Sequence, residues 1–239
     1  MIYAAAVTSP LSNNTVIVGT PRRHMPATEP SVLRLLVFTP SADDGFVDNA
    51  LRGLARTLAG LPVCGIAIGR RQQDARERAI ATTWSDVASM VGALGPEAEH
   101  GLATIEQLPV IANASVRVLP LRFALSFDRL DPEAVLRVYR GRARPGELEE
   151  YTEEVREGTF ADDSAAQGPL TLCLAVDEPD QFVTVSTWTD WDTIMRATGG
   201  NIRHPIATRH SHRLLEGTAD LYEILPRTPD ETRLVPTPT

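Results

Sequence analysis

Three histidines gather near the carboxyl end of the chain, where they can support acid–base chemistry. His204, His210 and His212 all lie in the stretch NIRHPIATRHSHRLL, which begins at Asn201. A neutral imidazole can take a proton from a phenol or a carbon acid near pH 7, and the substrate anion that results can pass an electron to oxygen. We therefore predict His204 and His210 as catalytic residues. The alternative interpretation is a polar loop in solvent.

The same residues do not predict a metal site. His210 and His212 form an HxH pair, but no carboxylate or cysteine nearby completes a coordination shell. Cys64 and Cys173 lie in separate apolar runs that are typical of buried free thiols. All 23 basic residues are arginine, and the motifs GxSxG, HExxH and GxGxxG are absent. Lysine-dependent chemistry, such as Schiff-base formation, is therefore excluded.

Tryptophans occupy matching positions in the two halves of the chain. TTWSD, which begins at Thr82, recurs 104 residues later as STWTD, so that Trp84 falls on Trp188. An indole offers a flat surface for an aromatic substrate and one N–H donor. We predict a catalytic role for Trp188 and substrate binding for Trp84 and Trp191, the last of which has Val87 as its counterpart. A core anchor between strand and helix is the alternative interpretation of Trp84 and Trp188.

Three further residues complete the predicted substrate-binding set. Arg203 lies in the histidine-rich stretch, Tyr222 lies near the end of the last predicted strand, and Tyr139 lies on the first strand of the second half. Tyr139 is expected to alternate with Arg137, one side chain facing the sheet interface and the other facing the helices or solvent. Ordinary packing is the alternative interpretation for each.

The elements that must position these residues follow one order, which occurs twice. The pattern of apolar residues predicts strand, helix, strand, strand, helix, strand in each half, which is the split unit of ferredoxin-like folds. Strands are expected at Val32–Thr39, Val63–Ile68, Ala79–Thr83, Val116–Leu125, Val135–Gly141, Leu170–Val176, Phe182–Ser186 and Ala219–Leu225, and helices at Gly45–Gly60, Val87–Leu94, Glu147–Glu157 and Asp190–Ala197.

The predicted fold class is α+β, with two ferredoxin-like (βαββαβ) units fused into an intramolecular dimeric α/β barrel. Helices cover only one face of each sheet, so the two sheets must pack against each other around side chains or a small ligand. We expect an N-terminal arm (1–30), a first unit (31–125), a linker (126–132), a second unit (133–226) and a disordered tail (227–239). The result is an internal pseudo-dimer, and a further homodimer is left open.

Charge and composition limit the classes of partner that the protein can bind. A formal net charge of −8 opposes binding to nucleic acid or to an anionic membrane surface. No apolar run approaches the roughly 20 residues that a spanning helix needs, and the chain start lacks the basic residues of a signal peptide. The sequence therefore predicts a cytoplasmic protein with a small hydrophobic or aromatic substrate, and with neither nucleic acid nor membrane as partner.

The second half resembles a known family. VLRVYRGRARPGELEEY, QFVTVSTWTDWDTIMRATGG and ADLYEIL are similar to the antibiotic biosynthesis monooxygenase (ABM) superfamily of dimeric α/β barrels. The resemblance is clear over about Ala134–Leu225 and weaker over Ser31–Leu125. It implies a cofactor-independent monooxygenase of secondary metabolism that acts on an aromatic or polyketide-like molecule, with molecular oxygen as co-substrate.

The residues of the family match only in part. In quinone-forming members a tryptophan acts with an asparagine and an arginine; Trp188 and Trp84 match the tryptophan, but Thr184 and Ile80 occupy the asparagine position. Two alternatives therefore stay open: a non-catalytic small-molecule-binding or scaffold protein, and a non-redox cyclase or isomerase that uses the same pocket. Haem-degrading members share an asparagine and a helical tryptophan that are absent here, although His204 falls near their histidine, so haem is not expected.

The two halves differ after their second helices. The second half has the three histidines there, whereas the first has no histidine between Gly101 and Val116. We therefore expect the chemistry in the second unit, with the first unit as scaffold.

Overall fold

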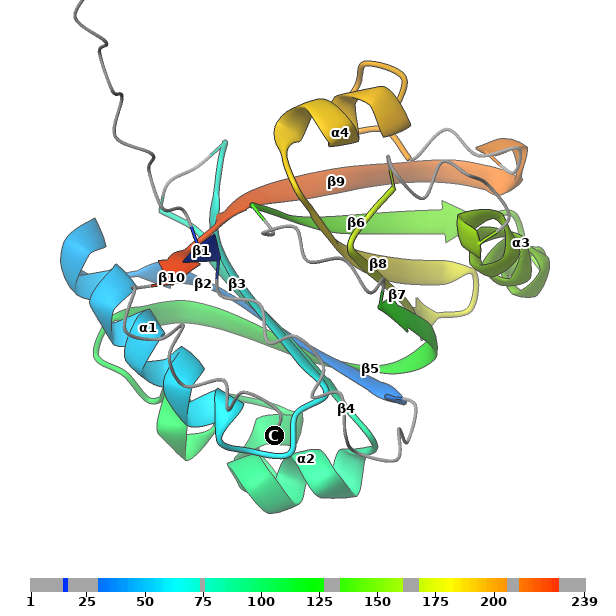
Figure 1. Ribbon diagram of the computed structural model, residues 1–239. Helices are drawn as coiled ribbons and strands as arrows, with labels where there is room; N and C mark the ends of the chain where they lie inside the picture. Colours follow the sequence, from blue (N-terminus) through cyan, green and yellow to red (C-terminus); the bar gives the residue numbers. More distant parts are fainter. Residues whose placement is uncertain are drawn as a thin grey trace, which may run out of the picture.

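The computed structural model of the chain describes residues 15–16, 30–73, 76–126, 134–160, 168–205 and 211–227 (Figure 1). The predicted N-terminal arm lies outside the described residues except for a two-residue strand, β1 (Thr15–Val16), which pairs with β10 (Pro226–Arg227). Most of the predicted linker, the tail beyond Arg227 and His210 also lie outside the described residues.

The predicted order of elements is confirmed in both halves. The first half contains β2 (Val32–Pro40), α1 (Asp44–Ala59), β3 (Gly65–Arg71), β4 (Arg78–Trp84), α2 (Val87–Leu94), the short 3-10 helices η1 (Pro96–Glu99) and η2 (Thr104–Glu106), and β5 (Ile111–Ser126). The second contains β6 (Val135–Ala143), α3 (Leu148–Phe160), β7 (Thr171–Glu178), β8 (Gln181–Trp188), α4 (Trp191–Ala197), η4 (Ser211–Arg213) and β9 (Leu214–Ile224).

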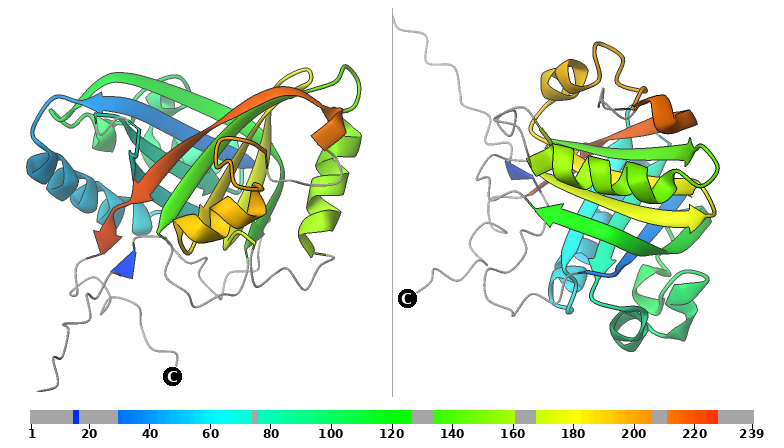
Figure 2. Two further views of the ribbon diagram at one scale, coloured as in Figure 1. Left: turned by 90° about the horizontal axis from the view of Figure 1, so that it is seen from above. Right: turned by 90° about the vertical axis from the view of Figure 1, so that its right-hand side faces the viewer.

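The eight long strands form one closed barrel. Its order is β5-β2-β4-β3 followed by β9-β6-β8-β7, so that each unit contributes four neighbouring strands in the order of a ferredoxin-like sheet. Two seams join the units: β3 pairs with β9, and β5 pairs with β7, both antiparallel. The helices lie outside the barrel, with α3 across the outer face of the second unit (Figure 2). The fold is therefore α+β with two fused ferredoxin-like units.

Side chains from both units fill the barrel interior. Strand residues alternate between the interior and the helix layer, because successive side chains point to opposite faces of a sheet. One buried cluster joins the units inside the barrel: Leu33, Leu35, Ala67, Ala79, Ala81, Leu119, Leu136, Val138, Cys173, Ala175, Val183, Val185, Tyr222 and Ile224. Of the two possibilities left open by the sequence, the interior holds side chains.

The outer faces of the sheets carry separate cores beneath the helices. In the first unit, α1 and α2 cover a large cluster that includes Leu36, Leu51 and Trp84. In the second unit, one cluster lies under α3 and another, around Trp188, lies under α4. None of the described helices is long and apolar enough to cross a membrane. Of the predicted site residues, Trp84, Tyr139 and Trp188 lie in these layers, whereas Tyr222 belongs to the interior cluster.

Candidate functional site

The two units turn from their third strand into their second helix through the same corner. Trp84 ends β4 and Trp188 ends β8, and neither side chain is exposed to solvent. The indole Nε1 of Trp84 donates to Thr82 Oγ1 at 2.9 Å, and that of Trp188 donates to Ser186 Oγ at 2.9 Å. Because each indole is enclosed and its single donor is used, both tryptophans anchor the corner from inside the core.

An aspartate begins the second helix of each unit. Asp86 accepts a hydrogen bond from Ser89 N at 2.6 Å, and Asp190 accepts one from Thr193 N at 2.7 Å. These backbone hydrogen bonds hold the pKa of both carboxyl groups below their usual range, because they favour the ionised form. The paired caps give α2 and α4 the same entry geometry.

A buried arginine on each first strand holds the turn that follows the second helix. Arg34 donates from Nε to Ala98 O and from Nη2 to Gly101 O, both at 2.9 Å. Arg137 donates from Nε to Ile202 O at 3.5 Å and from Nη2 to His204 O at 2.5 Å. Both arginines are 1% exposed. Each guanidinium therefore fixes the backbone of this turn from beneath.

The turn carries a histidine in both units. His100 lies 104 residues before His204, the same spacing that relates Trp84 to Trp188, and both imidazoles are exposed. The sequence comparison began at Gly101 and so missed His100 by one residue; extending the constant spacing would have found it. Arg203 is also exposed on the second turn, where its backbone N–H donates to Asn201 Oδ1.

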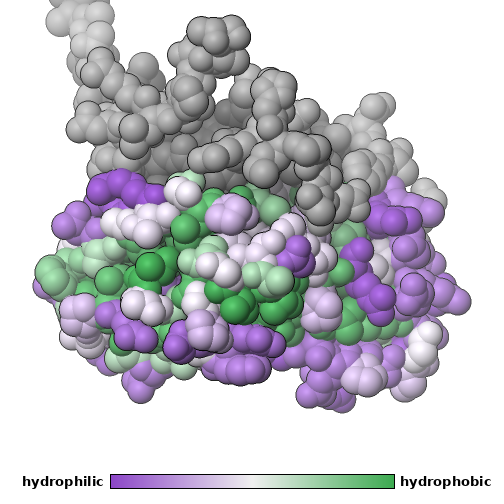
Figure 3. Space-filling view, turned by 90° about the horizontal axis from the view of Figure 1, so that it is seen from below, coloured by the Kyte–Doolittle hydropathy of each residue, from purple (hydrophilic) through white to green (hydrophobic). Residues whose placement is uncertain are grey.

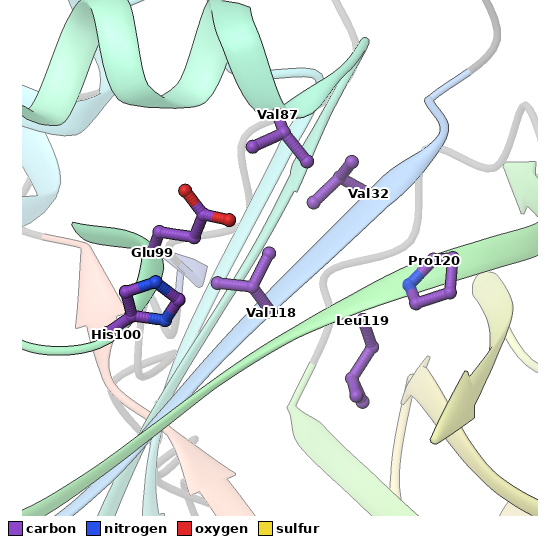
Figure 4. Close-up of a pocket in the computed structure, with 7 residues that line it drawn as sticks. All are labelled: Val32, Val87, Glu99, His100, Val118, Leu119 and Pro120. Atoms are coloured by element: carbon purple, nitrogen blue, oxygen red, sulfur yellow. The ribbon is translucent and has the colours of Figure 1, made fainter. Parts of the chain in front are cut away.

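In the first unit, the turn borders a hollow of about 250 Å³. Glu99 and His100 lie at one end of it and Pro120 lies at the other (Figure 4). The walls between them are mainly apolar and come from β2, α2 and β5: Val32, Val87, Val118 and Leu119. The hollow thus combines an apolar lining with an imidazole and a carboxylate, which sequence analysis had not assigned to a site.

The hollow lies beside α2 and η1 of the first unit, because Val87, Glu99 and His100 line it. Hydrophobic and hydrophilic residues mix on the face seen from below (Figure 3). Val87, which begins α2 and borders the hollow, is 37% exposed. An apolar ligand would therefore cover surface that now contacts water.

The second unit places a tryptophan at the position of Val87. Trp191 is half-buried and packs against the cluster formed by Val135, Trp188, Ile194 and Leu221. Its indole adds bulk at the place where Val87 borders the hollow. Trp191, Trp188 and the turn with Arg203 and His204 are thus brought to one end of the second unit.

Arg137 and Tyr139 share one face of β6, so the prediction that they alternate was wrong. Residues two apart on a strand point to the same side, and both side chains face the helix layer. The Arg137 guanidinium lies 5.1 Å from the centre of the Tyr139 ring. Tyr139 is buried beside Phe182, with ring centroids 5.9 Å apart, and burial raises the pKa of its phenol. Its hydroxyl is buried without a hydrogen-bond partner.

The structure does not bring Tyr222 to this group. Its side chain is fully buried, belongs to the barrel-interior cluster and donates from the hydroxyl to Glu77 Oε1 at 2.8 Å. Burial and the hydrogen bond to Glu77 raise its pKa. Trp84 lies in the other unit, and His210 lies outside the described residues. Among the described residues, no cluster of histidine, cysteine and acidic side chains has the arrangement of a metal site.

Comparison with known proteins supports the fold. No family model matches the sequence, and no curated protein matches it significantly. A proposed monooxygenase from Fusobacterium nucleatum superposes with a TM-score of 0.62 at 15% identity, over 82% of this chain and 93% of the other. A second, from Lactobacillus acidophilus, gives 0.61 at 8% identity, over 81% and 93%. The chain therefore shares its fold with these structures, and its own fused two-unit ferredoxin-like arrangement is the one that the resemblance to the ABM superfamily implied.

Proposed function

We propose that the protein is a cofactor-independent monooxygenase that oxidises a small aromatic or polyketide-like molecule. The observation that carries the proposal is the apolar hollow of about 250 Å³ with the His100 imidazole at its edge. Ligand sites are typically apolar concavities of about 300–1,000 Å³ with a few placed polar groups, so this hollow, which lies just below that range, limits the proposal to a small ligand. The fold shared with proposed monooxygenases supports the same reaction class.

The candidate substrate class is an anthrone, because a further structure of the same fold is named an anthrone oxidase-like protein. That structure superposes with a TM-score of 0.51 at 12% identity, over 82% of this chain and 92% of the other. An anthrone has an acidic methylene between two aromatic rings. A histidine that removes one methylene proton would generate an anion able to give an electron to oxygen. The methylene then becomes a carbonyl: one oxygen atom enters the quinone, and the other leaves with both hydrogens as water.

Three histidines, one in the first unit and two in the second, can provide the base in this proposal. His100 borders the hollow in the first unit, whereas His204 and His210 are the residues proposed from the sequence in the second unit. Trp191, Tyr139 and Arg203 are the proposed substrate contacts of the second unit. The enclosed Trp84 and Trp188 hold the corner beneath these sites and do not reach solvent.

Oxygen uptake with anthrone tests the proposal. We expect wild-type protein to consume one O2 molecule per quinone formed. The variant that removes the base should lose at least about 100-fold in kcat/KM, the usual contribution of a general base. His100→Ala, His204→Ala and His210→Ala identify the base. His212→Ala, also exposed in the second unit, is the matched control and keeps wild-type turnover. Turnover that survives in all three single variants would contradict a histidine base.

A binding protein is the second candidate, and the enclosed tryptophans favour it. Neither indole is available to stack on a substrate, since both are 0% exposed. If the protein only binds, anthrone will quench the fluorescence of the half-buried Trp191 without oxygen consumption. A cyclase or isomerase that rearranges the substrate would instead give a product of the same molecular mass.

A further inference from the structure

The two buried arginines differ in how their charge is neutralised. In the first unit, Glu106 reaches Arg34 with both carboxylate oxygens: Nη1 to Oε1 and Nη2 to Oε2 are each 2.6 Å. The Glu106 side chain is completely buried, and its Oε2 also accepts from Ala103 N at 3.0 Å. The guanidinium of Arg34 thus has a carboxylate on one edge and a turn carbonyl on each of two further donors.

Arg137 holds the equivalent turn without such a carboxylate. Within the described residues, it donates to the carbonyls of Ile202 and His204, lies over the Tyr139 ring, and forms no ion pair. The Nη1 atom of Arg137 donates to none of the described residues. In Arg34, the corresponding Nη1 atom donates to Glu106 Oε1. Burial lowers the pKa of Arg137 to about 10, so the guanidinium remains charged at neutral pH.

The loop that supplies Glu106 in the first unit has no acid in the second. Arg34 pairs across the sheet with Val118 through β2 and β5, and Arg137 pairs with Leu221 through β6 and β9; the spacing between the units here is 103 residues. With a spacing of 103 or 104, Glu106 corresponds to Arg209 or His210. No aspartate or glutamate occurs from Thr193 to Leu215. No residue of this loop can therefore neutralise Arg137.

A buried charge without a counter-charge is costly, and an anion that binds beside it removes that cost. We propose that the second unit binds the carboxylate of a small aromatic acid at Arg137, in the place that the Glu106 carboxylate takes against Arg34. A guanidinium fork matches the two oxygens of a carboxylate in parallel hydrogen bonds. The Tyr139 and Tyr151 rings, both packed on Phe182, provide aromatic surface near the fork.

The Tyr139 hydroxyl is a second unsatisfied group on the same strand face. It extends over Gly217 of β9, where any Cβ would clash with it, so this glycine keeps room for the phenol. A buried hydroxyl that lacks a partner can donate to a ligand oxygen at little cost. Within the described residues, the site thus combines a guanidinium that has carbonyl acceptors but no carboxylate with a phenol that has no acceptor. The proposed binding is separate from the hollow beside His100 and does not rest on the oxygenase reaction, although it uses Tyr139, which is also a proposed substrate contact of the second unit.

Thermal unfolding with matched probes tests this inference. Benzoate and 2-naphthoate are compared with benzamide and 2-naphthamide, which have the same rings without the charge, at constant ionic strength. We expect the carboxylates to raise the Tm of wild-type protein in a saturable manner and the amides to leave it unchanged. Arg137→Met should abolish the shift. Arg137→Lys, which keeps the charge but loses the fork, should weaken the apparent affinity by at least about tenfold, a measure of one lost charged hydrogen bond.

The first unit offers the converse control. Glu106→Ala empties the carboxylate position beside Arg34, and we expect acetate or formate to raise the Tm of this variant more than that of wild-type protein. The inference is overturned if the aromatic carboxylates do not stabilise wild-type protein beyond the amides. It is also overturned if they stabilise Arg137→Met or Arg137→Lys as strongly as wild-type protein. If Arg137→Met does not fold, the lysine variant alone decides.

Discussion

At the scale of single residues, we expect substitution of Arg34 and of Arg137 to lower the free energy of unfolding by different amounts. Arg34→Met leaves the fully buried Glu106 carboxylate without its partner, which should lower the free energy of unfolding by about 3–5 kcal/mol. Arg137→Met leaves two turn carbonyls unpaired but removes a charge that has no carboxylate partner among the described residues. We expect Arg137→Met to lower the free energy of unfolding by at least about 2 kcal/mol less than Arg34→Met does. Urea unfolding in a buffer without carboxylates measures both values, and equal losses would contradict a free charge at Arg137.

Some site residues could be predicted from the sequence, and the reason is spacing. The recurrence of Trp84 at Trp188 follows from one shift, and the same shift relates His100 to His204. Whether each guanidinium has a carboxylate partner could not be predicted, because Arg34 and Glu106 are 72 residues apart in the sequence and are brought together only by the fold. The apolar hollow was also beyond prediction, since β2, α2 and β5 assemble it.

At the scale of elements, the N-cap of α4 gives a pH-dependent prediction. Asp190 accepts hydrogen bonds from the backbone N–H and hydroxyl of Thr193, and its pKa is lowered mainly by the backbone bond. Asp190→Ala should lower the free energy of unfolding by about 1 kcal/mol, the usual worth of a cap. The lowered pKa means that the ionic part of this stabilisation is complete above the unfolded value of about 3.9 and is lost as the pH falls through the folded value.

Asparagine at this position separates the charge from the cap. Asp190→Asn keeps the side-chain acceptor but does not titrate, so its free energy of unfolding should approach that of wild-type protein as the pH is lowered from 6 to about 3.5. Chemical unfolding at each pH measures the difference. A constant difference over this range would exclude the ionised carboxyl as the source of the stabilisation.

Element order could be predicted because apolar periodicity distinguishes strands from helices, but the lengths of two strands could not. β5 begins at Ile111 and β9 at Leu214, in both cases five residues before the predicted start. The added segments, IANAS and LLEGT, have mixed polarity and no strand periodicity. They pair with the far ends of β2 and β6, across register shifts in each case. Partner strands, rather than local preference, determine their conformation.

At the scale of the whole molecule, the barrel joins the two units through one interior and two seams. Besides the shared interior cluster, side-chain contacts cross both seams: Arg71 pairs with Asp220, Tyr222 donates to Glu77, and Arg117 pairs with Asp177. Each contact joins a residue of the first unit to one of the second. We therefore expect the units to unfold in one transition, since separating them would expose the interior faces of both sheets.

Gly69 offers a direct test of this coupling, because it lies at the seam between β3 and β9. A Cβ at this position would lie 2.5 Å from Tyr222 Cβ. Gly69→Ala should therefore lower the free energy of unfolding by about 1–3 kcal/mol through overpacking. Gly53→Ala is the matched control: it lies in α1 with nothing within 4 Å of the added methyl, and should be neutral or stabilising by up to about 1 kcal/mol.

The test of coupling is whether Gly69→Ala at the seam changes the unfolding transition of both units. Trp84 reports on the first unit when Trp188 and Trp191 are phenylalanine, and Trp188 reports on the second when Trp84 and Trp191 are phenylalanine. Gly69→Ala in each background should shift both fluorescence transitions to lower denaturant by the same free energy, since the interior at the seam belongs to both sheets. A shift confined to one reporter would show that the units unfold separately, and the barrel would then be an association of two independent domains.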